Sequence, residues 1–106
     1  MPQAEIAYTI ADLLLRLISQ RGDAVHLHDG ESPVLEIKRS LHKIEGPALK
    51  PGDTYALLAI HAPEEDLRAF QSDGLACFYH RVQDSVFQFM AFRESGHVRL
   101  EMRKLK

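Results

Sequence analysis

Three runs rich in aromatic and β-branched residues occupy the last third of the chain, at residues 76–82, 85–93 and 97–105. Asp84 lies in the first gap between these runs, and Gly96 lies in the second. Residues of this kind favour strands, and gaps this short leave room only for hairpin turns. The sequence therefore predicts an antiparallel meander of three strands at this end of the chain.

The middle strand of this meander is apolar on both of its faces. Phe87 and Phe89 share one face because side chains alternate along a strand, while Gln88, Met90 and Phe92 share the other. We expect the helices of the domain to cover one face. The other face then exposes an apolar patch, which on a soluble protein usually marks a contact surface.

The segments upstream of the meander include three helical patterns. Apolar residues recur at helical spacing over residues 5–20, and Gly22 suits the end of that helix. Pro51 and Pro63 suit the first turn of a helix, because proline lacks an N–H that this turn leaves unpaired. The expected helices that begin at these prolines cover residues 51–61 and 63–71.

Three further strand patterns precede those two helices, at residues 25–28, 34–38 and 41–44. The predicted order is one helix, three strands, two helices and three strands. Such an order indicates an α+β domain with one antiparallel-rich sheet of about six strands and helices packed on one face. A length of 106 residues corresponds to a single domain, residues 1–106.

Charge and hydropathy exclude several classes of function. A net charge of −2, with basic residues scattered along the chain, gives no footprint for a nucleic-acid backbone. No apolar run approaches the roughly 20 residues needed to cross a bilayer, and the first residues lack the basic region of a signal peptide. We therefore expect a cytoplasmic protein that neither inserts into membranes nor binds nucleic acid.

The chain contains no recognisable catalytic motif. A phosphate-binding loop requires the pattern G-x-x-x-x-G-K-[ST], and none of the six glycines fits it. A dinucleotide fingerprint and a G-x-S-x-G nucleophile elbow are missing from the sequence as well. We expect no enzyme activity, no catalytic residue and no cofactor in this chain.

Two histidines lie two positions apart on the first expected strand. His26 and His28 would project from the same face and could chelate a metal together with Asp29, His42 or His80. The pattern is also that of the polar side of a half-buried strand. Because the number and geometry of ligands are unsupported, we expect no metal site.

Two other features near the end of the chain have simple structural interpretations. Cys77 lies between Ala76 and Phe78, and we expect it to be a small buried residue of the core. The basic residues Arg99 and Arg103 belong to a half-buried strand, which we expect to be a solvated edge strand. A docking role for that edge, by accepting a strand from a partner, is an alternative.

The segment at residues 22–44 resembles the start of the N-terminal domain of PilT-type twitching-motility and secretion ATPases. The matching positions are His26, Leu27, Gly30, Pro33, Val34, Leu35 and Ile37. The connection at Gly46, Pro47 and Leu49 and the pattern at Phe87, Ala91 and Phe92 follow in the same order. The resemblance implies a PAS-like domain, which in that family is joined to a RecA-like ATPase core and packs between subunits of a hexameric ring.

Several positions depart from the family pattern. The resemblance implies an aspartate at Ala24, an arginine at Glu36 and an Asp-Gly turn at residues 38–39. It also implies charged or polar residues at Val86, Gln88 and Met90, where arginines of the family approach nucleotide phosphates. Apolar positions are kept while charged positions are not, so we expect a sheet that is used for packing or docking.

The sequence thus predicts a non-catalytic interaction or regulatory domain. Its expected partners are a pilus or secretion ATPase, a second copy of itself, or a pilus-regulating protein. Two alternatives are a PAS-like small-molecule sensor, with a ligand cup near His26, Tyr79 or Gln88, and the N-terminal part of a longer or degenerate secretion ATPase. The candidate interaction and family-motif positions are His26, His28, Pro33, Gln88, Met90 and Phe92.

Overall fold

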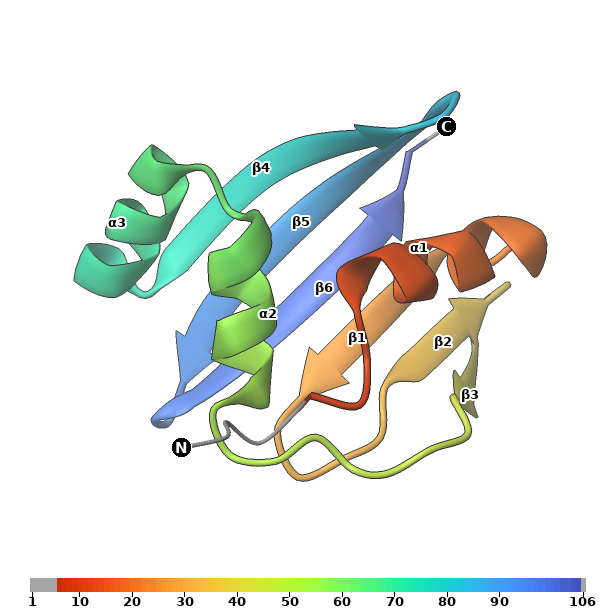
Figure 1. Cartoon of the computed structure of the whole chain (residues 1–106), viewed down its shortest axis with the longest axis horizontal. Coiled ribbons are helices and arrows are strands. Elements are labelled where there is room, and N and C mark those ends of the chain that lie inside the picture. The colour runs from red at the N-terminus through yellow and green to blue at the C-terminus, as the bar shows by residue number, and fades with distance from the viewer. Residues whose placement is uncertain (1–5, 106) are drawn as a thin grey trace.

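Three helices and six strands make up residues 6–105, the part of the chain that the computed structural model describes (Figure 1). In chain order they are α1 (Ile10–Ser19), β1 (Ala24–His28), β2 (Val34–Ile37), β3 (Ser40–Lys43), α2 (Asp53–His61), α3 (Glu64–Asp73), β4 (Leu75–Val82), β5 (Ser85–Glu94) and β6 (His97–Lys104). The predicted α+β class and the predicted order of elements are confirmed.

The six strands form one antiparallel sheet in the order β3-β2-β1-β6-β5-β4. The prediction of an edge strand at the end of the chain is wrong, because β6 lies between β1 and β5. Leu100 faces Leu27 of β1 on one side and Ala91 of β5 on the other. The edge strands of the described chain are β3 and β4. Arg99 and Arg103 therefore project from a face of the sheet rather than border its edge.

Figure 1 shows α1 and α2 in front of one face of the sheet and α3 beside the start of β4, where its Phe70 joins the same core. Their apolar side chains meet the covered face of the strands in one core. The members of this core that are buried most deeply include Leu14, Leu17, Leu27, Leu58, Phe70, Phe87, Phe89, Leu100 and Met102. Phe78 and Phe89 stack across β4 and β5 with ring centroids 4.9 Å apart. Burial of this apolar surface is the main contribution to the stability of the fold.

The first helix is shorter than predicted because Thr9 caps it. The Thr9 hydroxyl accepts the N–H of Asp12 at 3.1 Å, which fixes the start of α1 at Ile10; residue 5 lies outside the described residues. At the other end, Arg21 adopts the left-handed conformation and Gly22 donates its N–H to the carbonyl of Leu17. This is a Schellman motif with arginine in the position that glycine usually takes, so Gly22 follows the turn instead of making it.

The second helix is anchored by a side chain from another part of the chain. Its N-cap is Gly52, which has no side chain, so the turn after β1 supplies the cap instead. The Asp29 carboxylate accepts the N–H of Gly52 at 2.7 Å, the N–H of Thr54 at 3.0 Å and the Thr54 hydroxyl at 2.6 Å. This contact explains why α2 begins at Asp53 and not at Pro51.

Candidate functional site

The face of the sheet opposite the helices is not covered by any described element, and we call it the open face. Its residues follow from the strand register, because directly opposed residues of antiparallel strands share a face. They are Ala24, His26, His28, Val34, Glu36, Leu41, Lys43, Leu75, Cys77, Tyr79, Arg81, Val86, Gln88, Met90, Phe92, Glu94, His97, Arg99, Glu101 and Arg103. The open face is the candidate functional site.

One half of the open face, over β4 and β5, is apolar. Leu75 is 54% exposed and Tyr79 is 61% exposed, with Cys77 exposed between them. Across the register, Met90 faces Cys77 and Phe92 faces Leu75, and both of these β5 side chains are half-buried. These five side chains therefore form a continuous patch, which we call the apolar patch.

Next to the apolar patch lies a cluster of four ionisable side chains. His26 Nε2 lies 2.9 Å from a Glu36 oxygen, and His26 Nδ1 lies 3.6 Å from a Glu101 oxygen. Arg103 donates to Glu101 at 3.0 Å and to Glu36 at 3.3 Å. The hydrogen bond with His26 lowers the pKa of Glu36 although burial opposes that shift, and Arg103 lowers it further. Glu36 is thus held ionised, and both carboxylates are paired with Arg103 and His26.

The structure brings five of the six candidate residues to the open face. His26 and His28 project from β1, and Gln88, Met90 and Phe92 project from β5, which follows from the alternation used to select them. Pro33 is not among them. It lies just before β2, where its carbonyl accepts the N–H of Ile44 at 2.8 Å, so its observed role is to join the end of β3 to the start of β2.

The prediction that Cys77 is buried is wrong. Its neighbours Ala76 and Phe78 are buried, but Cys77 has the opposite orientation in β4 and is exposed on the open face. The error arose because an apolar neighbourhood in sequence does not distinguish the two faces of a strand. The Gln88 amide lies 3.6 Å from the Cys77 sulfur and 3.4 Å from the Tyr79 hydroxyl, so these three side chains meet on the open face.

Sequence reasoning missed three residues of the charged cluster. The sequence indicates Glu36 only as a departure from the family pattern and Arg103 only as a basic residue of an expected edge strand, and it does not single out Glu101. All three side chains lie on the same face of the sheet as His26. His26 faces Glu101, and Ala24, two residues before His26, faces both Glu36 and Arg103. The alternation of side chains can identify these residues only when the pairing of β1 with β6 is known.

The histidines do not gather into a metal site. Among residues 6–105, no group of three or more His, Cys, Asp or Glu side chains is placed to hold a metal ion. His28 instead lies 3.0 Å from a Glu31 oxygen and makes an edge contact with His97, with ring centroids 5.8 Å apart.

A second pair of histidines lies on the covered side of the sheet. His61, at the end of α2, and His80 of β4 have ring centroids 5.8 Å apart. Burial lowers the pKa of His61 below its ordinary value of 6.5, and the positive charge of His80 lowers it further. A proton on His61 is therefore held less tightly in the folded chain than in the unfolded chain.

This difference predicts a loss of stability at mildly acidic pH. The free energy of unfolding is expected to be largest above the ordinary histidine pKa and to fall as the pH drops from about 7 towards about 5, because the unfolded chain binds the proton more tightly. The variant His61→Gln should flatten this part of the profile, measured by urea unfolding at a series of pH values. The control His42→Gln changes an exposed histidine of β3 and should leave the slope as it is. Equal slopes for the wild type and His61→Gln would contradict the prediction.

Two surface hollows bear on the alternative of a small-molecule sensor. One, of about 430 Å³, opens on the open face and is lined by His26, His28, Glu31, Ser32, Val34, Glu36, Leu41 and Arg99. Tyr79 and Gln88, which the sensor hypothesis placed beside His26, do not line it. Only two of its eight lining residues, Val34 and Leu41, are apolar, whereas the residues that line a ligand cup are mainly apolar.

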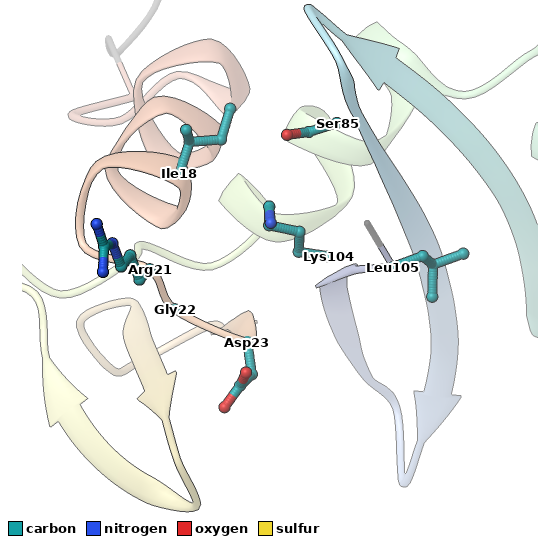
Figure 2. A pocket seen from close by; sticks show the side chains of 7 residues that line it. All are labelled: Ile18, Arg21, Gly22, Asp23, Ser85, Lys104 and Leu105. Atoms are coloured by element: carbon teal, nitrogen blue, oxygen red, sulfur yellow. The ribbon is translucent and has the colours of Figure 1, made fainter.

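The other hollow, of about 470 Å³, lies where α1 ends beside the start of β5 and the end of β6 (Figure 2). Figure 2 shows Ser85 and Lys104 pointing into the space beside Ile18, while the Asp23 carboxylate points away. That carboxylate accepts the N–H of Lys38 at 2.7 Å, so it holds the turn between β2 and β3. This hollow also mixes charged and apolar walls and is not an apolar cup.

Solved structures of a pilus retraction motor and of two DotB ATPases share this fold. The pilus retraction motor PilT with bound ADP superposes with a TM-score of 0.83 at 23% identity, over 93% of this chain and 29% of that chain. The ATPase DotB of Legionella pneumophila gives a TM-score of 0.75 at 16% identity, over 100% of this chain and 31% of that chain. DotB of Yersinia pseudotuberculosis gives 0.65 at 14% identity, over 100% of this chain and 34% of that chain.

These comparisons confirm, for the fold, the resemblance that the sequence indicated. The chain spans about a third of the length of the ATPases that it matches. No protein-family model matches the chain, and no curated protein matches it. Within residues 6–105, no helix is both long and apolar enough to cross a membrane.

Proposed function

We propose that residues 1–106 form a non-catalytic docking domain, related to the N-terminal part of pilus retraction and secretion ATPases, that works in the cytoplasm. The observation that carries this proposal is the open face, where exposed apolar side chains lie beside paired charges. A partner that covers this surface gains from burial of the apolar patch, and the charges of the cluster already have partners, so none of them would be left buried and unpaired.

The chemistry of the open face supports docking more than catalysis. The strand positions where the resembling family carries charged or polar residues are here Val86, Gln88 and Met90, which are half-buried and uncharged. Uncharged, half-buried residues at these three positions have little to offer a nucleotide phosphate, whereas an apolar surface fits a protein partner. Our proposed partner is a subunit of a PilT-type ATPase ring.

One substitution in the apolar patch of the open face tests this function. Phe92→Asp places a charge in the apolar patch and should weaken binding to a purified PilT-type ATPase about tenfold or more, in the presence or absence of ATP. The matched control is Ile60→Asp, because Ile60 is 70% exposed on α2, on the helical side of the sheet. Binding is measured by biolayer interferometry with each variant immobilised, after circular dichroism has shown that both are folded.

Two results would overturn the proposal. If both variants bind the ATPase as well as the wild type does, the open face is not the docking surface. If the wild type binds no ATPase while a small molecule stays with the purified chain, the sensor alternative replaces docking.

A further inference from the structure

Strand β4 is a long edge of the sheet, and α3 lies beside its start only (Figure 1). Its eight residues, Leu75–Val82, pair one to one with β5 and no bulge interrupts them. In residues 6–105, β5 is the only strand that pairs with it. Its sequence, LACFYHRV, contains no proline, glycine, lysine or acidic residue. Protein sheets usually blunt such edges, since unpaired N–H and C=O groups recruit further strands.

The opposite edge of the same sheet shows the protection that β4 lacks. Strand β3 has four residues, Ser40–Lys43, all exposed, and a lysine ends it. A short, polar edge of this kind offers few hydrogen bonds to an incoming strand. The difference between the two edges indicates that β4, and not β3, is kept open for pairing.

We propose that a second copy of this chain adds its own β4 antiparallel to this one, so that the two sheets continue into each other. The two-fold axis that relates the two strands runs perpendicular to the sheet. The open faces of the two copies therefore lie on the same side of the combined sheet. Every second residue of β4 directs its N–H and C=O away from β5, and these groups would bond to the second copy. The apolar patches of the two copies then become neighbours.

The side chains of β4 complement themselves best when the two-fold axis passes through Cys77. Tyr79 then faces Leu75 of the second copy, an aromatic side chain beside an aliphatic one, and this contact occurs twice. On the covered face, Phe78 lies opposite Ala76 of the second copy, a large side chain against a small one. Arg81 lies outside the paired segment in this register, because β4 of the second copy begins at Leu75.

The neighbouring symmetric registers fit less well. An axis through Phe78 places Arg81 opposite the apolar Leu75, and an axis through Tyr79 places Arg81 opposite Cys77. Both place the guanidinium against a side chain that carries no carboxylate, whereas the register centred on Cys77 leaves it outside the paired segment. We therefore commit to the register centred on Cys77.

This inference concerns the edge of the sheet, whereas the proposed docking concerns its face, so either can hold without the other. The test is sedimentation equilibrium of the purified chain alone, over a series of concentrations, and it involves no ATPase. We expect a monomer–dimer equilibrium. Leu75→Lys should raise the dimer dissociation constant about tenfold or more, because it puts a charge opposite Tyr79 of the second copy.

The chain offers a matched control at the protected edge. Leu41 is a similarly exposed leucine, 67% against 54% for Leu75, and it lies on β3 at the far side of the open face. Leu41→Lys should leave the dissociation constant within about twofold of wild type. A wild-type chain that stays monomeric at every concentration, or equal effects of the two lysines, would overturn the proposal.

The single cysteine reports the register directly. Directly opposed residues in a bonded pair have Cα atoms about 5.5 Å apart, within the range that a disulfide spans. Diamide, which takes up the two protons and two electrons that two thiols release, should join the dimer through Cys77 of each copy, and Leu75→Lys should slow this reaction about tenfold. A dimer that forms in sedimentation but is not joined by diamide would contradict the Cys77 register.

Discussion

Replacing Asp29 by alanine is expected to lower the free energy of unfolding by about 2 to 3 kcal/mol. The Asp29 carboxylate caps α2 from outside the helix, through hydrogen bonds from Gly52 and from the amide and hydroxyl of Thr54. Thr54 is 0% exposed, so its hydroxyl would lose its partner in a place that water does not reach. A buried donor left unpaired costs more than the hydrogen bond itself contributes.

The measurement is urea unfolding followed by circular dichroism, with the melting temperature as a second readout. A loss of this size lowers the melting temperature of a domain of this length by roughly 10 to 20 °C. The control is Asp84→Asn, at an exposed aspartate in the turn between β4 and β5, which should change stability by less than about 0.5 kcal/mol. If Asp29→Ala is no more harmful than this control, the cap does not stabilise the fold.

The contact between Asp29 and the start of α2 also affects how the stability of the fold depends on pH in strong acid. Burial alone would raise the pKa of Asp29, but the hydrogen bonds from Thr54 and Gly52 outweigh it and lower the pKa below its ordinary value of 3.8. The ionised carboxylate therefore stabilises the fold above that value, and the contribution is lost as the pH falls through the lowered pKa. This window lies well below that of His61, so the two effects are separable in one pH series.

Local patterns were sufficient to predict most elements of the fold. The meander and the first hairpin follow from strand-forming runs separated by turns, which are properties of neighbouring residues. The position of β6 in the middle of the sheet was not predictable in this way. It depends on the pairing of Leu100 with Leu27, residues far apart in the chain, and no local pattern encodes such a pairing.

For the candidate site, too, the sequence predicts local features but not those that depend on packing. The alternation along β5 correctly grouped Gln88, Met90 and Phe92, since it requires only the period of a strand. Which face the helices cover depends on packing, and for that reason Cys77 was placed in the core although it lies on the open face. The cap from Asp29 to the start of α2 also joins segments distant in sequence, and nothing in either segment indicates the other.

Replacing Gly46 by alanine is expected to destabilise the fold by about 2 to 4 kcal/mol. Gly46 has a φ of +142°, a conformation that residues with a side chain rarely adopt. A Cβ at this position would also lie 2.5 Å from the Tyr8 hydroxyl oxygen, which donates a hydrogen bond to the Pro47 carbonyl. Alanine therefore strains the backbone and also displaces the contact that fastens the segment before α1 to the loop after β3.

A second glycine separates these two costs. Gly30 also has a positive φ, of +90°, but nothing lies within 4 Å of the Cβ that alanine would add there. Gly30→Ala should therefore show the backbone cost alone, about 1 kcal/mol, in the same urea titration. In a double-mutant cycle, Tyr8→Phe removes the oxygen that would collide with alanine at position 46. It should therefore raise the free energy of unfolding of the Gly46→Ala variant by about 1 kcal/mol, although it lowers that of the wild type. If the losses in the free energy of unfolding caused by Tyr8→Phe and Gly46→Ala are strictly additive, the collision with Tyr8 does not explain the need for glycine. The backbone conformation of Gly46 would then be the whole explanation.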